Sequence, residues 1–198
     1  MSDGWNLEDP LEILIVNRIG ENSIALSEYC LGAVYSPQDI VPENADEVWI
    51  SLLQAENGLY TVSGNEPDPD SVAVIRGPDP FLEGVLLSPV IRWYWQCLNH
   101  GQIANPFVAV SMLPICQPDW YDPGDRGRVD ALISCVNKRS YLLKMRVYSR
   151  HYHDLERISA QVRKNDEELF RLTSELYRFS DSLSRTLEMR VKERIRVA

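Results

Sequence analysis

The last 71 residues of this 198-residue sequence lack glycine and proline. All ten glycines and all twelve prolines lie at or before Gly127, and none occurs from Arg128 to Ala198. Because these two residues interrupt helices most strongly, their absence favours long helices here and excludes a turn-rich fold. The sequence therefore divides into a turn-rich N-terminal part and a helical C-terminal part.

Basic residues are scarce in the N-terminal part. Residues 1–125 hold 3 Lys and Arg against 19 Asp and Glu, whereas residues 126–198 hold 17 against 10. The first part thus has a net charge of −16 and the second of +7, which gives −9 for the chain. We predict an acidic head, residues 1–125, joined to a basic tail, residues 126–198, and we expect the head to fold without the tail.

Long apolar runs are absent, and cysteine is sparse. With no run of about 18 apolar residues and no basic segment followed by an apolar leader, we expect no membrane span and no secretory signal. The four cysteines form no CxxC pair, which argues against a zinc ribbon or a disulfide framework. We expect reduced, buried thiols in a soluble protein, either cytoplasmic or within an assembled particle such as a virion.

Start and stop signals predict the elements of the head. Asp9-Pro10 to Gly20 reads as a capped helix, with a strand as the alternative because of its β-branched residues. A capping box at residues 44–47 predicts a helix up to Gly58. Ser88-Pro89 and Gly101 bound another helix, with Trp93 and Cys97 toward the core and Trp95 toward another side. Alternation predicts strands over 59–63 and 71–76, and an apolar run predicts a third over 105–113.

The chemically suggestive residues do not form a convincing site. Cys97 and His100 are three apart on the predicted helix, so a thiol and imidazole pair in a small enzyme is geometrically allowed. A cysteine on an apolar stripe and a histidine at a helix C-terminus are more typical of structure, and we favour that reading.

No motif points to a metal or a cofactor. The acidic loop with Glu66, Asp68 and Asp70 lacks the central glycine and closing glutamate of a calcium-binding EF-hand. His151 and His153 would lie on different faces of a helix. Residues 122–130 contain neither the Walker lysine nor the GxGxxG order, and we read them as the joint between head and tail. We therefore predict no cofactor.

The tail carries a heptad pattern from residue 155 to residue 183. Its a and d positions are spaced alternately by three and four residues, and eight of the nine are apolar. Asn165 is the polar one, and a buried amide of this kind commonly fixes register. We predict partner binding through this seam, with packing of the helix against the head as the alternative. The predicted positions are Leu155, Ile158, Val162, Asn165, Leu169, Leu172, Leu176, Phe179 and Leu183.

A second apolar stripe precedes the heptads and is out of phase with them. Tyr141, Met145, Tyr148, Tyr152 and Leu155 follow helical spacing, but the step to Ile158 breaks their phase. This predicts a hinge near residues 149–154, so that the tail is either one rod or a bent hairpin.

The stretch from Arg126 to Arg150 is basic and contains tyrosines. It holds seven Lys and Arg against one acid, Asp130. Such a stretch can meet the acidic head of a neighbouring subunit or track the phosphates of a nucleic acid. We favour protein contact, because the acidic head would repel a polyanion. The candidate contacts are Arg126, Arg128, Lys138, Arg139, Lys144, Arg146 and Arg150.

Together these patterns predict an α+β fold. A compact mixed head with a small sheet and capped helices precedes a long C-terminal, coiled-coil-like helical tail. This arrangement is typical of a non-enzymatic structural subunit that assembles through its C-terminal helix with copies of itself or with other subunits. A virion or a phage tail or neck component is one such case. The alternatives are a nucleic-acid-associated regulator that uses residues 126–150 and a small enzyme that uses Cys97 and His100.

Overall fold

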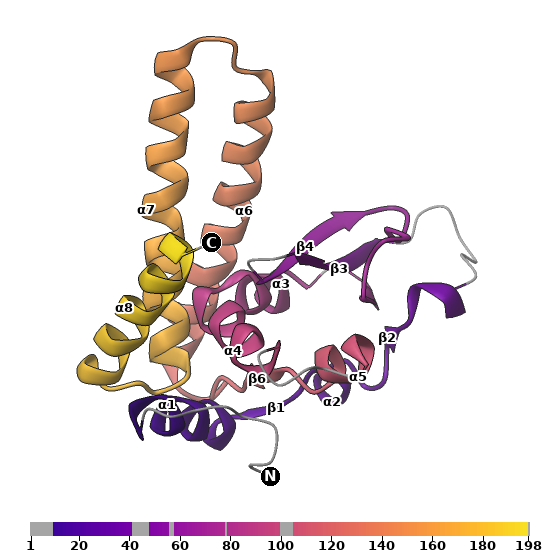
Figure 1. Cartoon of the computed structure of the whole chain (residues 1–198), viewed down its shortest axis with the longest axis vertical. Coiled ribbons are helices and arrows are strands. Elements are labelled where there is room, and N and C mark those ends of the chain that lie inside the picture. The colour runs from indigo at the N-terminus through magenta and orange to yellow at the C-terminus, as the bar shows by residue number, and fades with distance from the viewer. Residues whose placement is uncertain (1–9, 41–47, 56–57, 78, 100–104, 198) are drawn as a thin grey trace.

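The chain folds into a mixed helical and sheet body from which a helical hairpin projects (Figure 1). This computed structural model describes residues 10–40, 48–55, 58–77, 79–99 and 105–197. The α+β class with long C-terminal helices is confirmed. The helices are α1 (Pro10–Glu21), α2 (Leu26–Tyr29), α3 (Pro80–Leu87), α4 (Pro89–Asn99), α5 (Pro106–Ser111), α6 (Pro123–Tyr148), α7 (Tyr152–Leu176) and α8 (Asp181–Val197), with a 3-10 turn over Pro37–Asp39.

Two small antiparallel sheets form part of the body. A four-stranded sheet has the order β2-β5-β3-β4, and a two-stranded sheet pairs β1 with β6. The predicted strands over 59–63 and 71–76 correspond to β4 and β5. The strands are β1 (Ser23–Ala25), β2 (Val34–Tyr35), β3 (Trp49–Ala55), β4 (Gly58–Gly64), β5 (Ala73–Arg76) and β6 (Pro114–Cys116).

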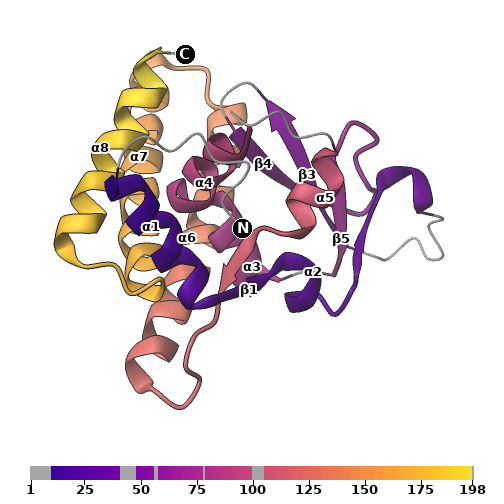
Figure 2. The same cartoon turned by 60° about the horizontal axis from the view of Figure 1, so that its bottom comes forward.

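Helices α3 and α4 lie between the larger sheet and the C-terminal helices (Figures 1 and 2). Both begin with proline, and the Asp79 carboxylate caps α3 by accepting a hydrogen bond from the Leu82 N–H. Because α4 is covered on both sides, Trp93 and Trp95 are both buried, although the helical pattern placed them on different sides. Gly84 lets α3 approach α6, since a Cβ there would lie 2.9 Å from Cγ of Leu132.

The tail is a hairpin followed by a third helix, and not one rod. Helix α6 ends at Tyr148 and α7 begins at Tyr152, which places the hinge within the predicted segment. The chain turns again after α7, where Arg178 adopts the left-handed conformation with φ of 59°. The Ser180 hydroxyl then accepts a hydrogen bond from the Leu183 N–H at the start of α8. In Figure 1 the distal end of the hairpin stands clear of the body.

Head and tail contribute to the same hydrophobic core. Side chains of α6, α7 and α8 are buried in one cluster with those of the sheet and of α3 and α4. The Tyr177 hydroxyl, which is also buried, donates a hydrogen bond to the Pro114 carbonyl oxygen at 2.6 Å. The tail members of this cluster are Val129, Leu132, Val136, Leu169, Leu172, Leu176, Tyr177 and Leu187.

Two predicted elements of the head have the wrong type. The helix expected up to Gly58 is instead strand β3 over Trp49–Ala55, which pairs with β4 and β5; the capping-box residues 44–47 lie outside the described residues. The strand expected over 105–113 is instead helix α5, because the Asn105 side chain accepts a hydrogen bond from the Val108 N–H and Pro106 occupies the first turn. The helices predicted to begin at Pro10 and Pro89 are confirmed, and the Ser88 hydroxyl accepts a hydrogen bond from the Ile91 N–H at 3.4 Å. Asp9 and Gly101, the other predicted signals, lie outside the described residues, and α1 continues through Gly20 to Glu21.

Candidate functional site

The distal hairpin exposes a row of large side chains. Tyr141, Met145 and Tyr148 are spaced by four and three residues on α6, and Tyr152 begins α7. All four are exposed, and Tyr148 is 81% accessible. We call Tyr141, Met145, Tyr148 and Tyr152 the tyrosine stripe. Such a grouping of aromatic side chains on a projecting element is typical of an interaction surface.

Two of the seven basic side chains predicted to make electrostatic contacts are engaged within the chain. Arg128 pairs with Asp125 at 3.0 Å and with Glu175 at 2.9 Å. Arg139 pairs with Asp166 at 2.9 Å. The other five are exposed and form no ion pair with the described part of the chain: Arg126, Lys138, Lys144, Arg146 and Arg150.

Most heptad positions contact this chain's own helices and core. Ile158, Asn165, Leu169, Leu172 and Leu176 are buried, and the last three belong to the hydrophobic core. The remaining four positions are half-buried, and the turn between α7 and α8 interrupts the series after Leu176. Those four are Leu155, Val162, Phe179 and Leu183. Partner binding through the seam stays a prediction, for which only these four offer accessible surface.

Asn165 ties the two helices of the hairpin together. Its side-chain amide donates a hydrogen bond to the backbone carbonyl of Cys135 on α6 at 3.0 Å. A buried amide that finds its partner at one position only disfavours other registers, because a shifted helix would leave it unsatisfied. Its contact with α6 therefore specifies how α7 lies on α6.

A buried carboxylate joins the base of the hairpin to the turn between α7 and α8. Asp125, 1% exposed in its side chain, accepts hydrogen bonds from the Asp119 N–H at 2.8 Å, from Arg128 and from Arg178. Burial opposes its ionisation, but these three donors outweigh it and lower the pKa of Asp125. The Arg178 carbonyl in turn accepts a hydrogen bond from Arg18 of α1. This network positions α7 and α8 relative to the body.

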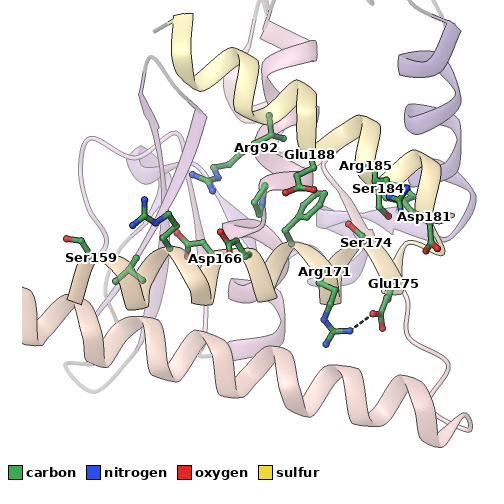
Figure 3. A pocket seen from close by; sticks show the side chains of 17 residues that line it. Arg92, Ser159, Asp166, Arg171, Ser174, Glu175, Asp181, Ser184, Arg185 and Glu188 are labelled. Atoms are coloured by element: carbon green, nitrogen blue, oxygen red, sulfur yellow. Dashed lines mark hydrogen bonds and ion pairs between the residues drawn. The ribbon is translucent and has the colours of Figure 1, made fainter. Parts of the chain in front are cut away.

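A groove of about 770 Å³ lies between α7 and α8, with α4 at its base (Figure 3). On the side of α7 that faces α8, its lining extends from Ser159 to Ser174, which corresponds to about 22 Å of helix. In Figure 3 Ser174 and Glu188 point into the space between the two helices, whereas Arg171 and Glu175 lie on the other side of α7. The apolar lining consists of Pro89, Val162, Phe170, Phe179 and Val191.

The groove contains a hydroxyl group with unused hydrogen-bonding capacity. The Ser174 Oγ is buried and has no hydrogen-bond partner among the described residues, although the residue lines the groove. Buried hydroxyl groups in proteins are almost always hydrogen-bonded. Because its Oγ is covered by the surrounding chain, Ser174 borders the groove without offering this atom to an occupant.

Among the described residues, the environment of the thiols does not favour their reactive form. Cys97 is buried in the core, while His100 lies outside the described residues, so their pairing stays a prediction. Burial raises the pKa of Cys116 to about 12 and that of Cys30 to about 11, which keeps both thiols protonated at neutral pH. All four cysteines are free thiols. Within the described ranges no three His, Cys, Asp or Glu side chains are grouped to hold a metal ion.

Comparisons with protein-family models, curated proteins and solved structures found no match to this chain. None of the described helices combines the length and apolar character needed to cross a bilayer. The tyrosine stripe and the groove are the two surfaces of this chain that bear on its function. Sequence patterns indicated the tyrosine stripe and the basic residues. They did not indicate the groove. Its walls are α7 and α8, and the heptad pattern runs through the turn between these two helices without marking it.

Proposed function

We propose that the protein is a non-enzymatic structural or assembly subunit of a large complex, such as a virion or a phage tail or neck component. It contacts neighbouring subunits, either copies of itself or other proteins, through its C-terminal helices. The tyrosine stripe at the end of a projecting hairpin is the observation that carries this proposal.

The position of the tyrosine stripe supports an interaction role. Tyrosines supply much of the binding energy of protein interfaces, because one ring combines apolar area with a hydrogen-bonding group. Lys138, Lys144, Arg146 and Arg150 lie on the same half of the hairpin without ion pairs to the described residues. A basic, aromatic tip and an acidic head on the same chain are complementary in charge, which favours contact between copies.

Self-association should depend on the distal hairpin. Replacing residues 144–155 with a short Gly-Ser turn removes most of the tyrosine stripe but none of the core residues. We expect the wild type to form oligomers at micromolar concentration and the shortened protein to remain monomeric, as measured by sedimentation velocity. The thermal midpoint of the shortened protein, measured well below its association range, should stay close to that of the wild type.

Salt provides an independent check on the same assembly. Since the basic side chains are exposed, raising the salt concentration from 50 mM to 500 mM should weaken assembly without abolishing the aromatic contact. A wild type that remains monomeric at every concentration and salt level would contradict self-association.

Nucleic-acid binding is the second candidate, and one local arrangement favours it. Lys144, Arg146 and Arg150 are exposed without ion pairs to the described part of the chain, and Tyr148 lies among them. Basic groups that neutralise phosphates and an aromatic ring that stacks on a base are typical of single-stranded nucleic-acid binding.

A gel-shift titration tests this candidate directly. If it is correct, the protein should shift a single-stranded oligonucleotide at 50 mM salt, and the affinity should fall steeply as salt is raised. Replacing Lys144, Arg146 and Arg150 with alanine should remove the shift. Replacing the exposed Arg163 and Lys164 of α7 with alanine is the control. Absence of any shift at low salt would eliminate the nucleic-acid reading.

A further inference from the structure

We propose that α8 of one copy occupies the α8 position on a second copy, so that two chains form a domain-swapped dimer. In this dimer the turn between α7 and α8 opens, and the two helices become one continuous helix. The proposal goes beyond the assembly function above, because it adds a contact between copies that does not use the tyrosine stripe.

The turn that ends α7 is of a kind that usually contains glycine. The Arg178 N–H donates a hydrogen bond to the Glu175 carbonyl oxygen at 3.0 Å. The Phe179 N–H donates one to the Ser174 carbonyl oxygen at the same distance, which completes the Schellman pattern of a helix C-terminus. The left-handed residue of this pattern is usually glycine, but here it is Arg178, with φ of 59°. Because a Cβ makes this conformation unfavourable, the sequence encodes the end of α7 weakly.

The sequence across this turn is compatible with a continuous helix. Residues 177–180, which separate α7 from α8, contain neither glycine nor proline. The alternating spacing of three and four residues along α7 continues through Phe179 and Leu183. A single helix over both elements would therefore keep these two side chains on the apolar face of α7. The first N–H groups of α8, which have no backbone partner within that helix, would gain one.

Few buried side chains attach α8 to its own copy. Over residues 181–191, the part of α8 whose side chains the structure describes, only Leu187 is buried. Leu183 and Val191 are partly buried against the same core. An ion pair at 3.7 Å between Arg190 and Glu12 joins α8 to α1. An element with so few buried contacts detaches at a lower free energy than the rest of the core, so α8 can leave the body without unfolding it.

The direction of α8 suits an exchange between two copies. In Figures 1 and 2 α8 runs back beside α7, so that the two helices point in opposite directions with the groove between them. If both copies straighten about a twofold axis at the turn, α8 of each lies beside α7 of the other in this same antiparallel sense. Its contacts with α1 and α4 are then remade on the partner. A second copy is therefore the occupant, because this surface already fits α8 in the monomer.

Two contacts of Arg178 oppose the exchange in the monomer. Its guanidinium group pairs with the buried Asp125. Its carbonyl oxygen accepts a hydrogen bond from the Arg18 Nε–H at 3.0 Å. Both contacts hold the turn in its closed form, so a copy at low concentration keeps α8 on its own body. Because the exchanged form contains two copies, high protein concentration favours it.

A proline at the start of α8 tests the exchange. Asp181→Pro places proline in the first turn of α8, where proline is favoured, but in the interior of the continuous helix, where it breaks the helix. Asp181→Ala is the control, because it removes the same exposed carboxylate and permits both forms. All proteins carry Tyr141→Ser and Tyr148→Ser at exposed residues, so that the tyrosine stripe does not contribute to association. We call this background the stripe variant.

Sedimentation velocity after refolding from urea at high protein concentration measures the exchange. We expect dimers of the stripe variant with and without Asp181→Ala. With Asp181→Pro the protein should remain monomeric, and its thermal midpoint should stay close to that of the stripe variant. Ser180→Ala removes the hydroxyl that caps α8 and favours a helix interior. Since two turns open in each dimer, it should raise the dimerisation constant about tenfold or more, whereas Ser182→Ala, at an exposed residue of the first turn, is its control.

Hydrogen exchange locates the contact within the dimer. The N–H groups of residues 180–182 should exchange about tenfold or more slowly in the dimer, where they belong to a continuous helix. A dimer that survives Asp181→Pro, or one whose residues 180–182 exchange as fast as in the monomer, would overturn the proposal. A stripe variant that stays monomeric at every concentration, even with Ser180→Ala, would overturn it as well. All these results would leave assembly through the tyrosine stripe standing, because that assembly is measured with the stripe intact.

Discussion

A fragment consisting of residues 1–124 is expected to lose cooperative folding. It lacks the buried side chains of α6, α7 and α8, including Leu132, Leu172 and Tyr177, which pack in the same cluster as α3 and α4. Removing them leaves the apolar faces of α3 and α4 in water, a loss much larger than the net stability of a small domain. Circular dichroism should show no cooperative thermal transition, and tryptophan emission should shift to the red as Trp93 and Trp95 become accessible to water.

The protein with the shortened hairpin is the matched control for this experiment. It loses residues 144–155 but retains every tail residue of the core, so a sharp melting transition is expected. A residue 1–124 fragment that melts cooperatively with buried tryptophans would instead establish a head that folds without its tail. That result would support the domain boundary near residue 125 that composition alone suggests.

The helices of the tail and the hinge between the first two could be predicted, because no residue type that interrupts helices occurs there. With no glycine or proline after Gly127, helical propensity acts without interruption, and the phase shift between Leu155 and Ile158 marks the hinge. The turn at Arg178 was not predicted, because the heptad spacing continues through it. Ser180, which caps α8, is the local signal that could have indicated it.

The two misassigned elements of the head show how tertiary pairing overrides a local pattern. Residues 48–53 satisfy a helical spacing, but Trp49 and Ile50 also suit a strand, and β3 pairs with two neighbours. The Asn57-Gly58 pair is a hairpin signal that favours the strand. In α5 the apolar run suggested a buried strand, whereas Asn105-Pro106 is a helix start of the kind that correctly predicted α4.

Sequence patterns could not predict the groove, because it depends on how three helices are arranged in space. Its lining comes from α4, α7 and α8, and its width depends on how the turn at Arg178 directs α8. The heptad pattern identified Val162 and Phe179 as contact residues, and both line the groove. It gave no means of separating them from Leu172 and Leu176, which face the core of their own chain. Periodicity identifies an apolar face, but the arrangement of elements decides what covers it.

Replacing Asp125 with asparagine should destabilise the protein strongly at neutral pH. The substitution removes the charge that Arg128 and Arg178 contact and leaves both guanidinium groups without a buried counterion. Breaking a buried ion pair from one side costs about 3–5 kcal/mol, and we expect about 3 kcal/mol because both arginines are partly exposed to water. The free energy of unfolding, measured with urea at pH 7, tests this value. Asp122→Asn is the control, because asparagine caps helix α6 as well as aspartate does.

The pH dependence of stability distinguishes the contribution of the Asp125 charge from that of its packing and hydrogen-bond geometry. Because the pKa of Asp125 is lowered in the folded state, its ionisation stabilises the protein fully above the unfolded pKa of about 3.9. This contribution disappears as the pH falls toward the lower folded value, where the wild-type carboxyl also becomes neutral. The difference in unfolding free energy between wild type and Asp125→Asn should therefore be constant from pH 7 to about pH 5 and shrink below pH 4. A difference that persists unchanged to pH 2.5 would mean that Asp125 acts through packing and hydrogen-bond geometry, and that the ion pairs at the base of the hairpin contribute little.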